Sequence, residues 1–188
     1  MRPDSPARAT GRTGPDTQHL HPHHMSAIVR HTIDSPVGPL TLAETDGALA
    51  ELRFGGSISG TPAPTPLLRQ AEEELAEYFA GRRRSFTLPL APQGTPFQRS
   101  VWEALQRIPY GETCTYGRIA ALVGRPKACR AVGMANHRNP LAIVIPCHRV
   151  VGSDGTLTGY AGGLAVKERL LRLEREEPSD GRTNRPRT

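Results

Sequence analysis

Two short segments near the start of the chain combine apolar residues with turn residues in the way that β-hairpins do. The ordered sequence is expected to begin near Ile28, and the segments at residues 40–43 and 48–54 flank the pair Asp46-Gly47. An Asp-Gly pair between two such segments is typical of a tight hairpin turn. The pattern therefore predicts a small antiparallel sheet, followed by a loop over residues 55–64.

The spacing of apolar residues changes after this loop. Thr65 can cap a helix and Pro66 suits its first position, while Gly81 suits its end. Between them the apolar side chains recur at helical spacing: Leu68, Ala71, Leu75, Tyr78 and Phe79. We expect one amphipathic helix here, and residues 88–94 to link the two halves of the chain.

The second half opens with a capping box, in which Thr95 and Gln98 can satisfy the free backbone donors of a helix start. The helix that follows carries its apolar residues on one side, and Pro109 and Gly111 end it: Phe97, Val101, Trp102, Leu105 and Ile108.

Two shorter helices are predicted next. The first starts at a Thr115 cap, turns Ile119, Ala120 and Val123 inward and stops at Gly124, and the second covers residues 126–136. Such a pair is either a helix-turn-helix that binds DNA or an ordinary packing unit.

The apolar run at residues 141–145 is short enough for a buried strand or extended segment, and it leads directly into Cys147. Glycines then indicate a loop: Gly152, Gly155, Gly159, Gly162 and Gly163. A last helix is predicted at residues 164–174. The expected organisation is a disordered tail at residues 1–24, an N-terminal α/β domain at 25–91, a C-terminal domain at 92–176 and a disordered tail at 177–188.

The N-terminal tail is rich in Pro, Arg, Thr, Gly and His, and Met25 is an alternative start. Its histidines could bind a metal loosely, but a solvated tail is the simpler account and we expect no metal: His19, His21, His23 and His24. No apolar run approaches the ~18 residues of a membrane span, and no secretory signal is evident. We therefore expect a cytoplasmic protein.

The charge of the chain is +6, and basic residues gather in its second half. Between Phe97 and Val150 eight basic residues stand against Glu103 and Glu112: Arg99, Arg107, Arg118, Arg125, Lys127, Arg130, Arg138 and Arg149. This stretch either provides a face for a polyanion or is simply a basic surface.

Three cysteines without CxxC spacing argue against a disulfide framework and a cysteine-built zinc site. We interpret Cys114 and Cys129 as structural. Cys147 is either an inert core residue or a nucleophile that a neighbouring base activates, and His148 is adjacent to it. On an extended chain the two side chains point apart, so direct contact is not assured, and a water could bridge them. The carboxylate of such a relay could be any of four: Glu174, Glu168, Glu103 and Glu112.

The sequence Pro146-Cys147-His148-Arg149-Val150, followed by residues 159–163 and Lys167-Glu168, resembles the active-site block of the methylated-DNA–protein-cysteine S-methyltransferases, the O6-alkylguanine-DNA alkyltransferases. The similarity covers roughly residues 28–174 and continues upstream in order: Phe97-Gln98, Val101-Trp102, residues 108–111, Thr115-Tyr116, residues 131–133 and 138–140. So many blocks in sequence make chance a poor explanation.

The resemblance implies an α+β fold: a small antiparallel sheet with a helix, ribonuclease H-like, then a mostly helical domain with a helix-turn-helix. It also implies DNA repair by irreversible transfer of a methyl or other alkyl group from O6-alkylguanine, and O4-alkylthymine, to the protein's own cysteine. Cys147 would accept the alkyl group, while Glu174, His148 and a water would carry its proton away. Asn139 would tie the helix pair to the active-site turn.

The resemblance further implies a monomer that binds alkylated double-stranded DNA and needs no cofactor. Tyr116 would meet the phosphate beside the lesion, and Arg130 would fill the stack that the flipped base leaves. The second helix would enter the minor groove, which suits its small residues Ala131 and Gly133. Tyr160, Ala161 and Val150 would belong to the substrate pocket.

Each of these residues also has an ordinary structural use: Tyr116 as a packing residue, Arg130 as a solvated charge and Asn139 as a turn former before Pro140. Ala161 stands where some members of the family have a hydroxyl or a larger residue, so tolerance for bulky alkyl groups could differ. Two other classes of protein remain open. One is a DNA-binding protein that only flags lesions, against which Cys147 argues, and the other is a thiol hydrolase that turns over.

Overall fold

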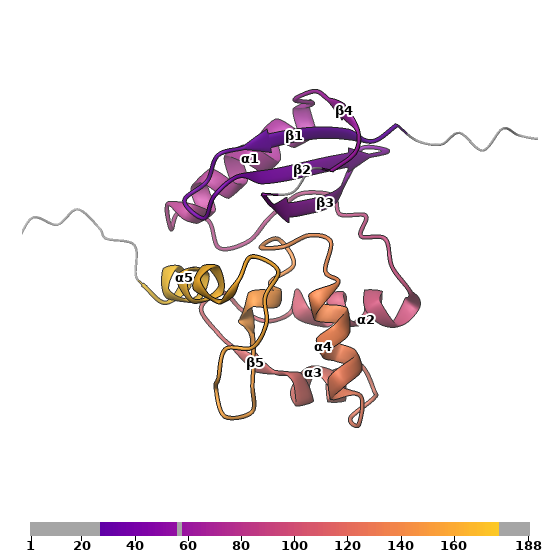
Figure 1. The fold of residues 1–188 in the computed structure, drawn as a ribbon, viewed down its shortest axis with the longest axis vertical. Coiled ribbons are helices and arrows are strands. Elements are labelled where there is room, and N and C mark those ends of the chain that lie inside the picture. The colour runs from indigo at the N-terminus through magenta and orange to yellow at the C-terminus, as the bar shows by residue number, and fades with distance from the viewer. Residues whose placement is uncertain (1–26, 56–57, 177–188) are drawn as a thin grey trace, which may run out of the picture.

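The computed structural model describes residues 27–55 and 58–176 of the 188-residue chain. The tails predicted to be disordered, with the four histidines of the N-terminal one, lie outside the described residues. Figure 1 shows a sheet with one helix packed on it above a second, mostly helical part that contains the Cys147 region. The α+β fold expected from the sequence is confirmed.

The sheet has four strands in the order β3-β2-β1-β4. They are β1 (Val29–Ile33), β2 (Leu40–Thr45), β3 (Ala48–Phe54) and β4 (Thr61–Pro62). The hairpin between β2 and β3 forms as predicted, with Asp46 and Gly47 both at positive φ. The loop predicted at 55–64 was partly wrong, because Thr61 and Pro62 pair with β1 in parallel. Two exposed residues carry no pattern from which this pairing could be predicted.

Helix α1 (Pro66–Phe79) begins where its sequence signals place it, because the Thr65 side chain accepts a hydrogen bond from the Leu68 backbone nitrogen. Its apolar side packs on the sheet, and Leu68, Ala71, Leu75 and Tyr78 are buried.

The outer edge of β3 joins the two halves of the molecule. Leu49 exchanges backbone hydrogen bonds with Pro89 and Ala91 of the segment that links the halves. Leu52 donates to the Pro140 carbonyl at 2.8 Å and accepts from the Ala142 nitrogen at 3.2 Å. The sheet therefore supports the chain just before Cys147.

The helical part contains α2 (Pro96–Leu105), α3 (Tyr116–Leu122), α4 (Cys129–His137) and α5 (Leu164–Arg175). The capping box of α2 forms as predicted, but Ile108 lies beyond the end of this helix. Helix α4 starts at Cys129 and not at Pro126, because residues 126–128 form a turn. A two-stranded parallel ladder, β5 (Cys114–Thr115) with β6 (Val150–Val151), joins the start of α3 to the chain that follows Cys147. Within the described residues, no helix is long and apolar enough to cross a membrane.

The apolar run at residues 141–145 is buried as expected, but it forms neither the strand nor the extended segment that the sequence predicted. The Ile145 nitrogen donates to the Leu141 carbonyl at 2.8 Å, which closes a turn, and Ile143 has a φ of 70°. A β-branched residue rarely adopts this left-handed conformation. The turn persists because its side chains are buried and the edge of β3 holds its first residues.

Candidate active site

Cys147 lies at the start of a short 3-10 helix, η1 (Cys147–Arg149), and only 3% of it is exposed. The expectation of an extended chain at this point was wrong. The 3-10 turn follows directly from the turn at residues 141–145, so Cys147 is held by backbone geometry on both sides.

Two asparagines hold the cysteine. The Asn139 amide nitrogen donates to the Ile145 carbonyl at 2.8 Å and lies 3.0 Å from the Cys147 Sγ, while its Oδ1 accepts from the Leu141 nitrogen. Asn136, from α4, donates to the Cys147 carbonyl at 3.3 Å. Asn139 thus lies where the sequence predicted it, between the helix pair and the Cys147 turn, whereas Asn136 was not predicted.

His148 and Glu174 form a buried pair, with 2.7 Å between the His148 Nε2 and the Glu174 Oε1 and no exposure of either side chain. The other three carboxylates considered from the sequence are exposed: Glu103, Glu112 and Glu168. The structure therefore selects Glu174 as the partner of the histidine.

Glu174 is bound by several further donors that the sequence did not indicate. Arg149 donates from Nε to Oε2 at 2.8 Å and from Nη2 to Oε1 at 3.0 Å, and Tyr78 donates to Oε1 at 2.7 Å. The Gly111 nitrogen donates to Oε2 at 3.1 Å, and a side chain at Gly111 would collide with the Glu174 backbone. Burial alone would raise the pKa of Glu174, but the bonds from His148 and Arg149 lower it to about 2.

The hydrogen bond to Glu174 fixes the role of each imidazole nitrogen. Because Nε2 faces a carboxylate, it carries the proton, and Nδ1 is then the acceptor. Nδ1 is buried and has no hydrogen-bond partner among the described residues. Burial lowers the pKa of His148 although Glu174 opposes this shift, so the imidazole is neutral at pH 7 and able to accept a proton.

The resting thiol is not ionised. Burial raises the pKa of Cys147 to about 11, although the hydrogen bond from Asn139 and the charge of Lys167 act in the opposite direction. Lys167 is buried and donates to the Val150 and Thr158 carbonyls at 2.7 and 2.9 Å. A base must therefore remove the proton before Cys147 can act as a nucleophile.

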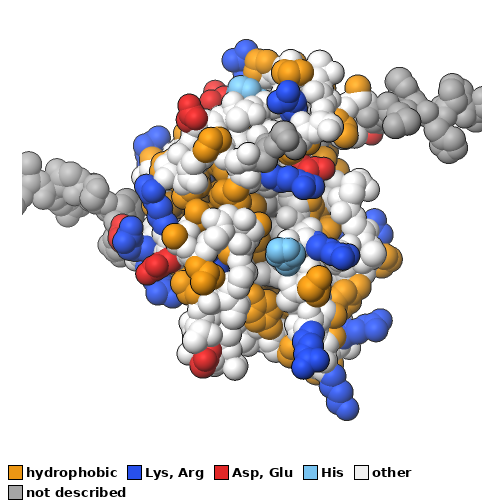
Figure 2. Space-filling view, viewed as in Figure 1, with side chains coloured by type: hydrophobic (Ala, Val, Ile, Leu, Met, Phe, Trp, Pro, Cys, Tyr) orange, Lys and Arg blue, Asp and Glu red, His pale blue; other side chains and the backbone are white. Residues whose placement is uncertain are grey.

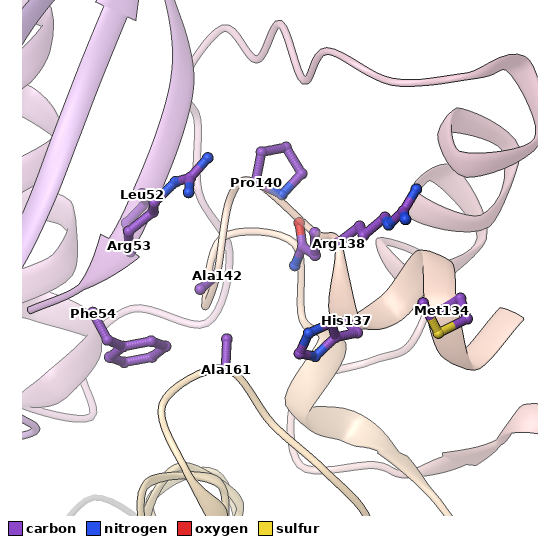
Figure 3. Close-up of a pocket in the computed structure, with 10 residues that line it drawn as sticks. Leu52, Arg53, Phe54, Met134, His137, Arg138, Pro140, Ala142 and Ala161 are labelled. Atoms are coloured by element: carbon purple, nitrogen blue, oxygen red, sulfur yellow. The ribbon is translucent and has the colours of Figure 1, made fainter. Parts of the chain in front are cut away.

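A pocket of about 610 Å³ opens beside Asn139, between β3 and α4 (Figure 3). Residues from β3 line one side, residues of α4 and the chain after it line the other, and Ala161 lies below them. The Phe54 ring lies against Gly162 and 5.5 Å from the Tyr160 ring. Three residues were predicted to belong to a substrate pocket. Ala161 lines the pocket beside Asn139, whereas Tyr160 and Val150 are buried.

The residues predicted to bind DNA lie on α3 and α4. Arg130 and Ala131 are exposed on α4. Gly133 faces the Tyr116 ring, and a Cβ atom at this position would be in van der Waals contact with that ring. The Tyr116 hydroxyl bonds the Thr158 hydroxyl at 2.8 Å. Around these helices Lys and Arg side chains project from the surface shown in Figure 2, and Asp and Glu side chains are few.

The other two cysteines differ from each other. Cys114 is buried within β5, where it pairs with Val150 of β6, in line with a structural role, whereas Cys129 is exposed at the start of α4. Neither has a histidine in hydrogen-bond contact among the bonds that the described residues make. Those residues also contain no group of three His, Cys, Asp or Glu side chains that could hold a metal ion.

Fold and site together define a two-part α+β protein with a cysteine beside a buried His-Glu pair and a basic helix pair nearby. The profile described as "6-O-methylguanine DNA methyltransferase, DNA binding domain" matches residues 96–176, and the one described as "6-O-methylguanine DNA methyltransferase, ribonuclease-like domain" matches residues 28–92. The chain belongs to the 6-O-methylguanine DNA methyltransferase family.

Individual relatives agree with this assignment. The methylated-DNA–protein-cysteine methyltransferase of Methanosarcina barkeri is 55% identical over 148 residues, which cover 76% of this chain and 94% of that protein. The constitutive enzyme of Bacillus subtilis is 48% identical over 154 residues, covering 77% and 93%. Mycobacterium tuberculosis OGT, solved in complex with DNA, is 49% identical with a TM-score of 0.76, covering 81% of this chain and 96% of that one.

Proposed function

We propose that this protein repairs DNA by transferring a methyl or other alkyl group from the O6 of guanine, or the O4 of thymine, to Cys147. The observation that carries the proposal is a buried cysteine, Cys147, whose Sγ accepts a hydrogen bond from Asn139 and which is followed in the chain by His148 of the buried His148–Glu174 pair. The names of the relatives, all methylated-DNA–protein-cysteine methyltransferases, support the same reaction.

The chemistry follows from the protonation states of the site. We propose that a water between the Cys147 thiol and the His148 Nδ1 passes the thiol proton to that nitrogen, and that the carboxylate of Glu174, which bonds Nε2, stabilises the resulting imidazolium. The sulfur then bonds to the alkyl carbon as the carbon–oxygen bond breaks. The electron pair of the broken bond stays on the oxygen of the nucleobase, which takes up a proton from solvent, and His148 returns to solvent the proton that it took from Cys147. The reaction therefore needs no metal or organic cofactor.

The pocket beside Asn139 would receive the alkylated base. Since the O6 atom of a stacked guanine is out of reach, the nucleotide must leave the duplex. We propose that α4 enters the minor groove, that Arg130 fills the vacated stack, and that Tyr116 meets the adjacent phosphate after exchanging its bond to Thr158. The small exposed side chain of Ala131 allows the close approach of α4 to the DNA, and Gly133 leaves room for the Tyr116 ring beside it.

We further propose that the protein acts as a cytoplasmic monomer, with an N-terminal domain at residues 25–91 and a C-terminal alkyltransferase domain at 92–176. The thioether formed at Cys147 is not hydrolysed, so each molecule acts once. A protein that only flags lesions would accept no alkyl group, and a thiol hydrolase would release many products per molecule.

Intact-mass analysis after exposure to duplex DNA containing O6-methylguanine tests the proposal. We expect one methyl group per protein, located on the Cys147 peptide. The variant Cys147→Ala should gain none and keep its affinity for DNA, while Cys129→Ala, which changes an exposed cysteine, should still gain one. A methyl group on Cys114 or Cys129, or product in excess of protein, would overturn the assignment.

A further inference from the structure

We propose that Tyr78, on helix α1 of the N-terminal part, is a positioning residue for the alkyl transfer. Its hydroxyl would hold the Glu174 oxygen that binds His148. This inference rests on the proposed function, and it assigns the N-terminal part a direct effect on the proton relay.

The geometry places the Tyr78 hydroxyl on the oxygen that matters. It donates to the Glu174 Oε1 at 2.7 Å, and the same oxygen accepts from the His148 Nε2 at 2.7 Å. The bond joins residues 96 positions apart and is buried, with Tyr78 only 1% exposed. A hydrogen bond to a charged group in such a place is stronger than one between neutral groups.

The tyrosine ring is itself held firmly. It packs against three other aromatic rings, with centroids 5.4 to 6.2 Å away: Phe79, Phe86 and Tyr110. Burial and the charge of Glu174 raise the pKa of Tyr78, so the hydroxyl stays protonated and acts only as a donor to the carboxylate. Removal of the oxygen alone would therefore change the carboxylate and leave the packing in place.

The effect of this hydroxyl on the relay has a definite sign. Without this hydroxyl, Oε1 loses a hydrogen-bond donor and binds the His148 proton more strongly, which raises the pKa of His148. As the pH falls, His148 then changes from the neutral to the protonated form at a higher pH than in the wild type. Charged and titratable groups lie around this pair on the elements packed against it: Tyr78 from α1, Tyr110 from the chain after α2, Arg149 from η1, Lys167 from α5 and Tyr160 from the loop before α5. Arg149 and Lys167 lower the pKa of His148, whereas the Tyr110 hydroxyl bonds the Leu173 carbonyl and neither member of the pair. Only Tyr78 among these groups donates from the N-terminal part to the carboxylate.

The test compares Tyr78→Phe with Tyr110→Phe. Both variants lose one hydroxyl from the same aromatic cluster, but the Tyr110 hydroxyl donates to the Leu173 carbonyl at 3.4 Å and not to the carboxylate. The single-turnover rate constant of methyl transfer from duplex DNA is measured as a function of pH, together with DNA affinity and thermal unfolding.

For Tyr78→Phe we expect a rate constant about 10-fold lower at neutral pH, as for other groups that orient a reacting side chain, and an acid limb moved to higher pH. DNA affinity should not change, and Tyr110→Phe should keep the wild-type profile. An unchanged rate and acid limb in folded Tyr78→Phe would overturn the inference. So would a loss that merely follows the unfolded fraction.

Two further measurements keep the test decisive. In the background of Glu174→Gln, the additional change Tyr78→Phe should have no effect on the pH profile, because the carboxylate is gone. If Tyr78→Phe fails to fold, fluorotyrosine at position 78 gives a stronger donor, and the acid limb should then move to lower pH. A wild-type protein that accepts no methyl group would overturn the proposed function, whereas a normal wild type with an unaffected variant overturns only the role of Tyr78.

Discussion

Glu174 and Arg130 each carry one charge, but the protein surrounds them in opposite ways. The Glu174 side chain has no exposed surface and accepts hydrogen bonds from four residues, whereas Arg130 is exposed on α4. The buried charge is fixed in one geometry, as the proposed proton relay would require. The exposed charge keeps its hydration and its conformational freedom, as the proposed contact with DNA would require.

Removing each charge should change the free energy of unfolding by very different amounts, and this is the largest effect that we predict. Glu174→Gln leaves Arg149 buried without a counter-ion, so we expect a loss of about 3–5 kcal/mol in the free energy of unfolding. Arg130→Ala should change it by less than about 0.5 kcal/mol. Denaturant unfolding followed by circular dichroism measures both, and equal losses would refute the contrast.

Protonation of Glu174 at acidic pH should also lower the free energy of unfolding. The pKa of Glu174 is about 2 in the folded protein against an ordinary value of 4.5. Its stabilising effect is therefore complete above pH 4.5 and is lost as the pH falls toward 2, by about 3 kcal/mol in total.

Unfolding measured at a series of acidic pH values checks this dependence. The wild type and Glu112→Gln, which removes an exposed carboxylate, should show the same decrease in the free energy of unfolding with falling pH. Glu174→Gln should lose this dependence. A slope that is the same in all three proteins would show that Glu174 is not its source.

The smallest of these predicted losses concerns the rate of methyl transfer when Arg130 is removed, and it should be seen only with duplex DNA. If Arg130 fills the stack left by the flipped base, Arg130→Ala should slow methyl transfer from a duplex about 10-fold, or roughly 1.4 kcal/mol. Transfer from the free base O6-methylguanine should be unaffected. Single-turnover rates with both substrates decide the matter, and equal losses would remove Arg130 from the flipping step.

Signals that act between close neighbours in sequence predicted local structure well. Thr65 and Thr95 cap the helices that follow them, and Asp46-Gly47 forms its hairpin, because each depends on bonds within a few residues. The run at residues 141–145 was predicted to be buried, which is correct. Its turn could not be predicted, because Asn139 and the edge of β3 impose it from outside the run.

The sequence singled out Cys147, His148 and Asn139, and the structure places all three at the candidate site. The sequence alone left four carboxylates open, and only the fold shows that three of them are exposed. Tyr78 could not be found, since its periodicity marks it only as a core residue of a helix. Arg149 was visible as a cation next to His148, but a bidentate bond across 25 residues leaves no trace in a sequence pattern.

The backbone bonds along the outer side of β3 have a consequence for solubility. A strand at the end of a sheet normally offers unpaired donors and acceptors to any other chain that can extend the sheet. Here the linking segment and the residues before Cys147 occupy those groups. The chain segment before Cys147 and the linking segment therefore cover this edge of the sheet against pairing with another chain, and they do so only while the two parts of the molecule remain packed together.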